Sequence, residues 1–356
     1  MLLLDRPDPG GLCRLLTPFP RAPGVVVLPP LILAPIYRRY LWGGRRFAST
    51  LGRDLPAGDD YAESWELVDR GGDQSTVAAG PLAGTTLGAI VRERGGELLG
   101  RSAPLPAFPL LFKFLDARLD LSVQVHPDDA RAARLVPPDR GKTEAWYVVD
   151  ATPGARIWAG TTPGTDAAAF AAALRAGRVA DVLHSFTPRP GDCVFVPAGT
   201  VHAIGAGLLV AEIQQSSDVT YRLHDWNRVG SDGKARPLHL EAGLEAVTRF
   251  GPVGPVAPET SADSAVHRLV TCDSFVFDEV RHGAGGAWHV GGDDGCHFLA
   301  VIAGTVRLED RWSLPPLGRG TCVLVPAAAG RQQIAMEPAG GDARVLHVAL
   351  PHRPTG

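Results

Sequence analysis

The chain has 356 residues, 35 of them basic and 38 acidic, with a formal net charge of −3 at pH 7. This length suits two packed units. The scattered basic residues exclude a nucleic-acid-binding stripe, and the lack of any apolar run of about 18 residues excludes a membrane helix. An odd number of cysteines, five, and a start unlike a signal peptide predict a reducing, cytoplasmic location.

The N-terminal third alternates loops with apolar strands. Residues 1–28 are rich in proline and glycine, which predicts a flexible extension. ESWELVD, which begins at Glu63, alternates in a way typical of an ordinary half-buried strand. The apolar run 109–117 encloses Lys113, whose ammonium needs a polar cavity because burying it without a partner is costly. Lys113 is also one of only three lysines, which favours a specific use for a compact cation.

The densest set of candidate metal ligands lies in the middle of the chain. Gln124 and His126 alternate with apolar residues, so both point to one face of a predicted strand. Glu144 opens an apolar run that predicts a neighbouring strand. His202 follows the strand 193–196 and a proline-glycine turn. Imidazole, carboxylate and amide oxygen donors together suit a borderline divalent ion such as zinc.

Helical patterns occur at four places, residues 87–94, 129–135, 165–184 and 238–250. Asp128 is the predicted N-cap of the second helix, and Thr165 is the predicted N-cap of the third. The third segment is rich in alanine and interrupts the strand pattern as a helical insert. Its His184 is more typical of a packing or surface residue than of a ligand.

The C-terminal part repeats the pattern of the middle part. The segment from Gly320 to Pro326 has the spacing of the segment from Gly191 to Pro197, and the apolar run at His297 echoes the one at Glu144. After Pro326 the second copy reads AAAGRQQ where the first reads AGTVH, so the last histidine has no counterpart. We therefore expect a second strand-rich unit that binds no metal and packs against the first.

Several motifs together resemble the type I mannose-6-phosphate isomerases in their short bacterial form, a family of the cupin superfamily. The strongest are QVHPDD, GKTEAWYV, PAGTVHAIG and EIQQSSDVTYRLHDWNR, with YLWGGRRF, ESWELVDR and FPLLFKFLDA upstream, so the resemblance covers residues 30 to 250 or so. It implies a mainly β fold of two cupin-type, jelly-roll barrels with a helical insert. The expected divisions are an extension over 1–28, a metal-binding catalytic domain over 29–250 with the insert 165–184, a linker over 251–265, and a degenerate, metal-free cupin domain over 266–356.

The resemblance also implies an activity. This is the zinc-dependent interconversion of mannose 6-phosphate and fructose 6-phosphate, in which a proton moves between C1 and C2 through an enediol(ate). The partner is then a small sugar phosphate, and the chain is expected to be a monomer or a weak homo-oligomer. One zinc ion per chain would be held by Gln124, His126, Glu144 and His202.

Three further residues are candidates for the proton transfer and for charge stabilisation. Lys142 lies two residues before Glu144, and Glu212 lies on the next predicted strand after His202. The sequence leaves the choice of base between Lys142 and Glu212 open. By resemblance, Arg222 stands at the place of an arginine important for catalysis, where a guanidinium would stabilise a negative oxygen.

The phosphate must be bound by side chains, because the chain has no glycine-rich phosphate loop. The resemblance assigns this role to Ser122, Lys113 and Arg228, with a solvated loop charge as the alternative for Arg228. Trp42, before a glycine pair, either lines the sugar pocket or packs in the core.

Two other function classes fit parts of the sequence. His126, Asp128 and His202 match the two-histidine, one-carboxylate pattern of nonhaem iron oxygenases, but Asp128 already serves as a predicted helix cap. A non-enzymatic, sugar-binding cupin is the other alternative. The many polar groups expected around the metal argue against it.

Overall fold

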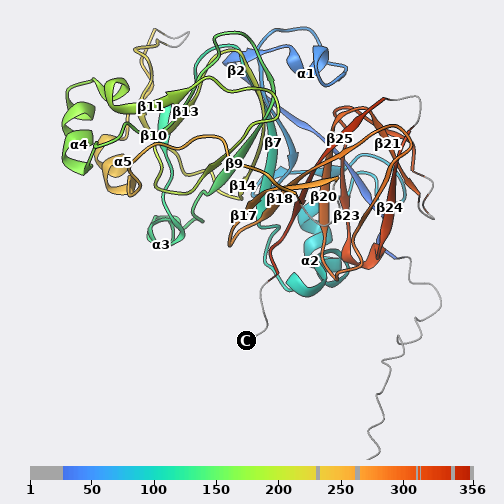
Figure 1. The fold of residues 1–356 in the computed structure, drawn as a ribbon. Helices are drawn as coiled ribbons and strands as arrows, with labels where there is room; N and C mark the ends of the chain where they lie inside the picture. Colours follow the sequence, from blue (N-terminus) through green and yellow to red (C-terminus); the bar gives the residue numbers. More distant parts are fainter. Residues whose placement is uncertain are drawn as a thin grey trace, which may run out of the picture.

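The computed structural model describes residues 27–229, 233–260, 265–309, 312, 314–337 and 341–352. The predicted extension 1–28 therefore lies almost wholly outside the described residues. Figure 1 shows two groups of strands side by side, with α4 and α5 against the outer side of the first group and α2 below the second. None of the helices in the described parts combines the length and the apolar character needed to cross a membrane.

The first group of strands is a pair of antiparallel sheets. Apolar side chains that include Leu115, Trp146 and Ile204 pack between the two sheets. The six-stranded sheet has the order β12 (Cys193–Val196), β9 (Glu144–Ala151), β14 (Leu208–Gln215), β7 (Leu110–Ala117), β3 (Tyr61–Leu67) and β2 (Ile36–Gly44). The five-stranded sheet has the order β11 (Leu183–Phe186), β10 (Ile157–Thr161), β13 (His202–Ile204), β8 (Val123–Val125) and β15 (Tyr221–His224).

The second group is also a pair of sheets, with its own apolar core around Trp288, Leu299 and Val345. The eight-stranded sheet has the order β16 (Glu259–Thr260), β17 (Val266–Thr271), β18 (Val276–His282), β25 (Ala343–Ala349), β20 (His297–Ala303), β23 (Cys322–Val325), β1 (Leu31–Ala34) and β6 (Thr76–Val77). The four-stranded sheet has the order β19 (Ala287–Val290), β24 (Gln332–Met336), β21 (Thr305–Glu309) and β22 (Leu317–Gly318). A short pair, β4 (Asp69–Arg70) and β5 (Asp73–Gln74), stands apart.

The two groups share one continuous core. The six-stranded sheet turns the face that carries Phe112 towards the eight-stranded sheet, where Phe298 lies with its ring centroid 4.8 Å away. Across the same junction the Tyr147 hydroxyl donates a 2.7 Å hydrogen bond to the buried Glu279 carboxylate. The predicted division at 251–265 stays a prediction, although β1 and β6 from the N-terminal part complete the C-terminal sheet.

The helices are short and lie at the edges of the sheets. They are α1 (Arg46–Ser49), α2 (Leu87–Leu99), α3 (Asp129–Ala132), α4 (Ala167–Arg175) and α5 (Leu240–Ala246), with 3-10 turns η1 (Gly100–Ser102), η2 (Val179–Val182) and η3 (Ala327–Ala329). Asp128 caps α3 as predicted, since its carboxylate accepts a 2.8 Å hydrogen bond from the Arg131 backbone N–H.

Three details of the predicted helices were wrong. Asp166, rather than Thr165, caps α4 by accepting from the Ala169 N–H. The insert does not stay helical to its end, because its last residues pair with β10 as strand β11. The predicted helix 238–250 shrinks to α5, since the backbone N–H groups of residues 248 and 249 bond to the Gly199 carbonyl instead of continuing the helix.

The predicted repeat is visible in the strand pairing. Glu144 at the start of β9 pairs with Val196, and His297 at the start of β20 pairs with Val325. The two copies of the GxCVxVP segment therefore occupy the same place in their sheets, and a histidine of the second copy stands where the first has the glutamate.

Candidate metal and substrate site

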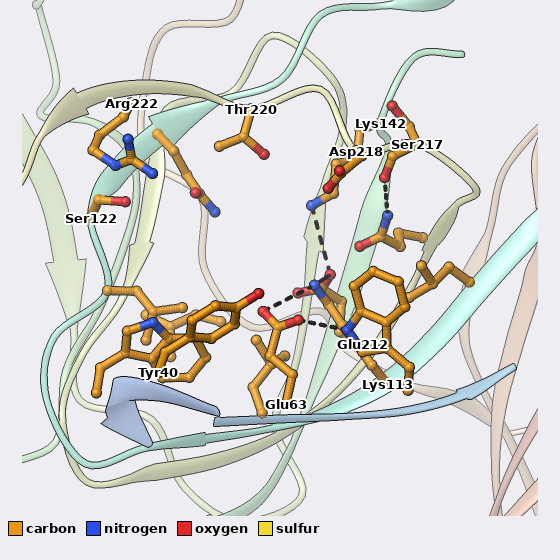
Figure 2. Close-up of a pocket in the computed structure, with 18 of the residues that line it drawn as sticks. Tyr40, Glu63, Lys113, Ser122, Lys142, Glu212, Ser217, Asp218, Thr220 and Arg222 are labelled. Carbon is orange, nitrogen blue, oxygen red and sulfur yellow. Dashed lines mark hydrogen bonds and ion pairs between the residues drawn. The ribbon is translucent and has the colours of Figure 1, made fainter. Parts of the chain in front are cut away.

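A pocket of about 390 Å³ opens between the two sheets of the first group. Both sheets contribute to its wall, and Figure 2 shows polar side chains pointing into it from either side. The lining residues are Tyr40, Trp42, Glu63, Trp65, Arg70, Leu111, Lys113, Leu115, Leu121, Ser122, Gln124, Lys142, Ile204, Glu212, Gln214, Ser217, Asp218, Thr220, Arg222 and Arg236.

Three of the predicted metal ligands form a buried cluster beside this pocket. His126, Glu144 and His202 each offer a donor atom, and these atoms all lie within 4.8 Å of one another. Glu144 Oε1 is 3.2 Å from His202 Nε2, and Glu144 Oε2 is 3.6 Å from His126 Nε2. No other such group of three occurs among the residues that the structure describes.

Backbone carbonyls fix the tautomer of both histidines. The Nδ1 atom of His126 is 2.8 Å from the Val219 oxygen, and that of His202 is 2.9 Å from the Thr200 oxygen. A carbonyl can only accept, so each Nδ1 carries the proton and each Nε2 keeps its lone pair for the cluster. Burial, followed by the charge of Lys142, lowers the pKa of His202 to about 3 and that of His126 well below its usual value, so both rings are neutral.

The arrangement of acceptors fits a bound cation. His202 Nε2 faces the Glu144 carboxylate with a lone pair, although Glu144 Oε1 is buried and has no hydrogen-bond donor. Burial raises the pKa of Glu144 to about 7, although Lys142 lowers it. Two acceptors 3.2 Å apart repel unless a proton or a metal cation lies between them, and a metal cation would satisfy both at once. The Gln124 amide reaches His202 Nε2 at 3.2 Å, and a turn of that amide would present its oxygen as a further donor.

The carboxylate of the alternative iron triad is used elsewhere. Asp128 caps α3 and pairs with Arg131, its side chain is 41% exposed, and it is not a member of the buried cluster. The observed cluster is therefore the one that contains Glu144.

An alternating chain of charges leads from the cluster along the six-stranded sheet. The Lys142 ammonium lies 2.5 Å from Glu144 Oε2 and 3.7 Å from Glu212 Oε1. On the other side of Glu212 Oε1, Lys113 Nζ lies at 3.2 Å, and Lys113 is in turn 3.6 Å from Glu63 Oε1. From the sequence, Glu63 was predicted to be part of an ordinary half-buried strand. Its i, i+2 spacing with Trp65 could have indicated that both side chains lie on one face, which is the face that lines the pocket.

Arginine side chains gather at the opposite end of the pocket, where Figure 2 places Ser122 beside Arg222. Arg222 pairs across strands with Gln124, its buried Nε atom has no hydrogen-bond partner, and burial together with Arg236 lowers its pKa. Arg236, which sequence reasoning missed, also lines the pocket and is held by Asp225 through a 2.8 Å hydrogen bond.

Arg228 is not placed in the lining of the pocket. Its guanidinium bonds to the Asp225 carboxylate at 2.5 Å and to the Asp120 carbonyl. It therefore shares the Asp225 carboxylate with Arg236. Trp42 does line the pocket, stacked on Tyr40 with a centroid separation of 5.6 Å.

Known proteins resemble this chain in sequence and in fold. The family described as phosphomannose isomerase type I, catalytic domain, matches residues 31–145. A mannose-6-phosphate isomerase of Bacillus subtilis is 33% identical over 312 residues, which are 85% of this chain and 94% of that protein. One from Streptococcus mutans is 37% identical over 297 residues, 83% of this chain and 92% of that protein. A crystal structure of the mannose 6-phosphate isomerase from Bacillus subtilis aligns with a TM-score of 0.81 at 29% identity, over 90% of this chain and 99% of that chain.

Proposed function

The chain belongs to the type I phosphomannose isomerase family, and we propose that it interconverts mannose 6-phosphate and fructose 6-phosphate in the pocket described above. The observation that carries this proposal is the juxtaposition of a buried His126, Glu144 and His202 cluster with a pocket of sugar-phosphate size. The histidine tautomers are fixed so that both Nε2 lone pairs point into the cluster, where they face the Glu144 carboxylate. This arrangement suits a metal-assisted reaction better than a passive binding site.

One zinc ion per chain would be held by Gln124, His126, Glu144 and His202. A zinc ion supplies a Lewis acid that polarises substrate oxygens while the carbon-bound proton is moved. The neutral imidazoles and the unsatisfied Glu144 oxygen support this ligand set. We further propose that each group of strands is a jelly-roll barrel and that the second binds no metal. In the second group His297 occupies the place of Glu144, and the turn after Pro326 has no histidine that corresponds to His202.

Lys142 and Glu212 are the two candidates to carry the proton between C1 and C2. Both line the pocket, and Lys142 touches the Glu144 carboxylate. Burial alone would raise the pKa of Glu212, but Lys113 and Lys142 lower it below its usual value, so the carboxylate is ionised and can accept a proton. Arg222 lies beside Gln124 and can stabilise negative charge on the enediol(ate) oxygen.

The phosphate is assigned to the arginine end of the pocket. Ser122 supplies a hydroxyl and Arg236 a guanidinium, while Arg228 acts through the Asp225 carboxylate that it shares with Arg236. Two arginines around one carboxylate leave a net positive charge that suits a dianion. Lys113 fits the sugar end better than the phosphate end, since its two near neighbours are carboxylates that would repel a phosphate.

The test combines metal analysis with an isomerase assay on the full chain. We expect one zinc per chain, conversion of mannose 6-phosphate to fructose 6-phosphate, loss of activity on chelation and recovery when zinc is returned. Full activity of metal-free protein would contradict the metal proposal. Binding of mannose 6-phosphate without conversion would instead indicate a sugar-binding module, and oxygen uptake with iron would indicate an oxygenase.

A further inference from the structure

The geometry points to Trp65 and Trp146 as positioning residues for the reaction. Each uses its indole N–H to fix one of the two carboxylates that flank Lys113. Trp65 holds Glu63, and Trp146 holds Glu212. The expected effect on kcat rests on the proposed function, because the two carboxylates belong to the chain of charges that leads to the metal cluster.

Strand pairing sets these residues in one row across the six-stranded sheet. Trp65 on β3 is directly opposite Lys113 on β7, and Lys113 is directly opposite Glu212 on β14. Glu212 in turn is directly opposite Trp146 on β9. Residues opposite one another in neighbouring strands point to the same face, so a lysine-glutamate pair lies between two tryptophans on the pocket side.

The hydrogen bonds in this row join buried or largely buried side chains. Trp65 Nε1 donates to Glu63 Oε2 at 2.6 Å, and Trp146 Nε1 donates to Glu212 Oε2 at 3.1 Å. In each carboxylate the other oxygen, Oε1, faces the Lys113 ammonium, at 3.6 Å for Glu63 and 3.2 Å for Glu212. Trp146 is fully buried and Trp65 is 8% exposed, so bulk water has little access to either indole N–H group.

An indole suits this task because it is a donor without a charge. It fixes the orientation of a carboxylate and leaves that carboxylate's negative charge available to the lysine. Burial by itself lowers the pKa of Lys113, but Glu212 and Glu63 raise it above its usual value, so the ammonium depends on both carboxylates. Trp146 also contacts His202 edge to face, with ring centroids 5.2 Å apart, which links the row to the metal cluster.

Tryptophan-to-phenylalanine variants remove the N–H donor and keep an aromatic ring. We expect Trp65→Phe and Trp146→Phe each to lower kcat by roughly tenfold to 100-fold, the scale of one lost hydrogen bond to a charged group. Bound zinc should stay at the wild-type level in Trp65→Phe, because Trp65 contacts Glu63 and not the cluster.

A double-mutant cycle separates positioning from a structural role. If Trp65 acts through Glu63, adding Trp65→Phe to a Glu63→Gln variant should cost less than about twofold in kcat, and the same should hold for Trp146→Phe in Glu212→Gln. Trp288→Phe is the matched control, since Trp288 is a buried tryptophan in the core of the second group. Trp288→Phe should lower the free energy of unfolding about as much as Trp65→Phe and Trp146→Phe do, and it should leave kcat unchanged.

A second readout does not depend on isomerase activity. The chain has only three lysines, so acetylation by acetic anhydride can be followed at each one by peptide mass spectrometry. The rate at Lys113 relative to the exposed Lys234 should rise in Trp65→Phe and stay unchanged in Trp288→Phe. A released carboxylate no longer holds the Lys113 ammonium in place.

The outcomes separate the two proposals. Wild-type protein that binds zinc but does not isomerise mannose 6-phosphate would reject the proposed function, and the Lys113 acetylation ratio would still decide the positioning role. Normal isomerisation with full, additive losses in the double variants, or an unchanged acetylation ratio in Trp65→Phe, would overturn the role of the tryptophans and leave the function intact.

Discussion

At the scale of single residues, hydrogen bonds from the Nδ1 atoms of His126 and His202 to backbone carbonyls orient the two imidazoles of the cluster. The imidazole of His126 is held by the Val219 carbonyl, and removing the ring takes away one of the three donor groups that form the buried cluster. We expect His126→Ala to lose bound zinc and activity together, as measured by metal analysis and the isomerase assay. His184→Ala, which alters a histidine stacked on Phe186, is the control and should keep both.

A second residue-scale prediction separates the two arginines of the pocket. Arg222 lies beside Gln124, so Arg222→Ala should lower kcat on the order of 10² to 10³, the usual cost of one donor to developing negative charge. Arg236→Ala should mainly raise KM for mannose 6-phosphate, since its guanidinium is assigned to the phosphate.

Free mannose provides the control for this pair, because it has no phosphate. Any slight activity on free mannose should be almost unchanged in Arg236→Ala and depressed in Arg222→Ala. Equal losses on both sugars for Arg236→Ala would show that this arginine acts on the reaction itself. Arg228→Ala is expected to resemble Arg236→Ala in a weaker form, because Arg228 reaches the pocket only through Asp225.

At the scale of strands and helices, the central motifs could be predicted because their information is local. The strand 193–196 appears with the predicted bounds, and the i, i+2 alternation of Gln124 and His126 directs both side chains towards His202. What could not be predicted depends on pairing between distant strands. Glu63 enters the site only because β3 lies against β7, and Arg236 enters from a loop whose course no periodic pattern describes.

A pair of strands in the second group gives a pH prediction. The Asp278 carboxylate on β18 is buried, accepts a 2.9 Å hydrogen bond from His347 on β25, and pairs with Arg268. Burial alone would raise the pKa of Asp278, but His347 and Arg268 lower it below its ordinary value of 3.8. The unfolded chain then takes up this proton first on acidification. The stabilisation is present above pH 4 or so and is lost as the pH falls further.

Asp278→Asn tests that sign. The variant should be less stable than wild type at pH 7, and its free energy of unfolding should fall less steeply below about pH 4, by at most about 1.4 kcal/mol per pH unit for one proton. Urea unfolding at pH 7, 4 and 3 measures both effects. The exposed Asp181→Asn is the control, and a slope for Asp278→Asn equal to that of wild type would contradict the assignment.

At the scale of the whole molecule, the strand that carries the proposed metal ligand Glu144 also contributes to the junction between the two groups. Glu144 on β9 lies in the buried cluster beside the pocket, and Tyr147 on the opposite face of the same strand bonds to Glu279 in the second group. The second group thus supports the back of the catalytic sheet. This contact is a physical reason why the second group matters for the site.

The last prediction follows from this shared core. A fragment ending at residue 260 would expose the apolar face around Phe112, leave β1 without its partner β23, and remove the acceptor of the Tyr147 hydroxyl. A face of that kind, uncovered, favours aggregation or a loosely packed state. We therefore expect the fragment to show no cooperative urea unfolding and no isomerase activity, and co-expression with residues 265–356 to restore both. A monomeric fragment that unfolds cooperatively and isomerises mannose 6-phosphate at the full-chain rate would show that the first group folds independently, and that the junction is a contact between finished domains.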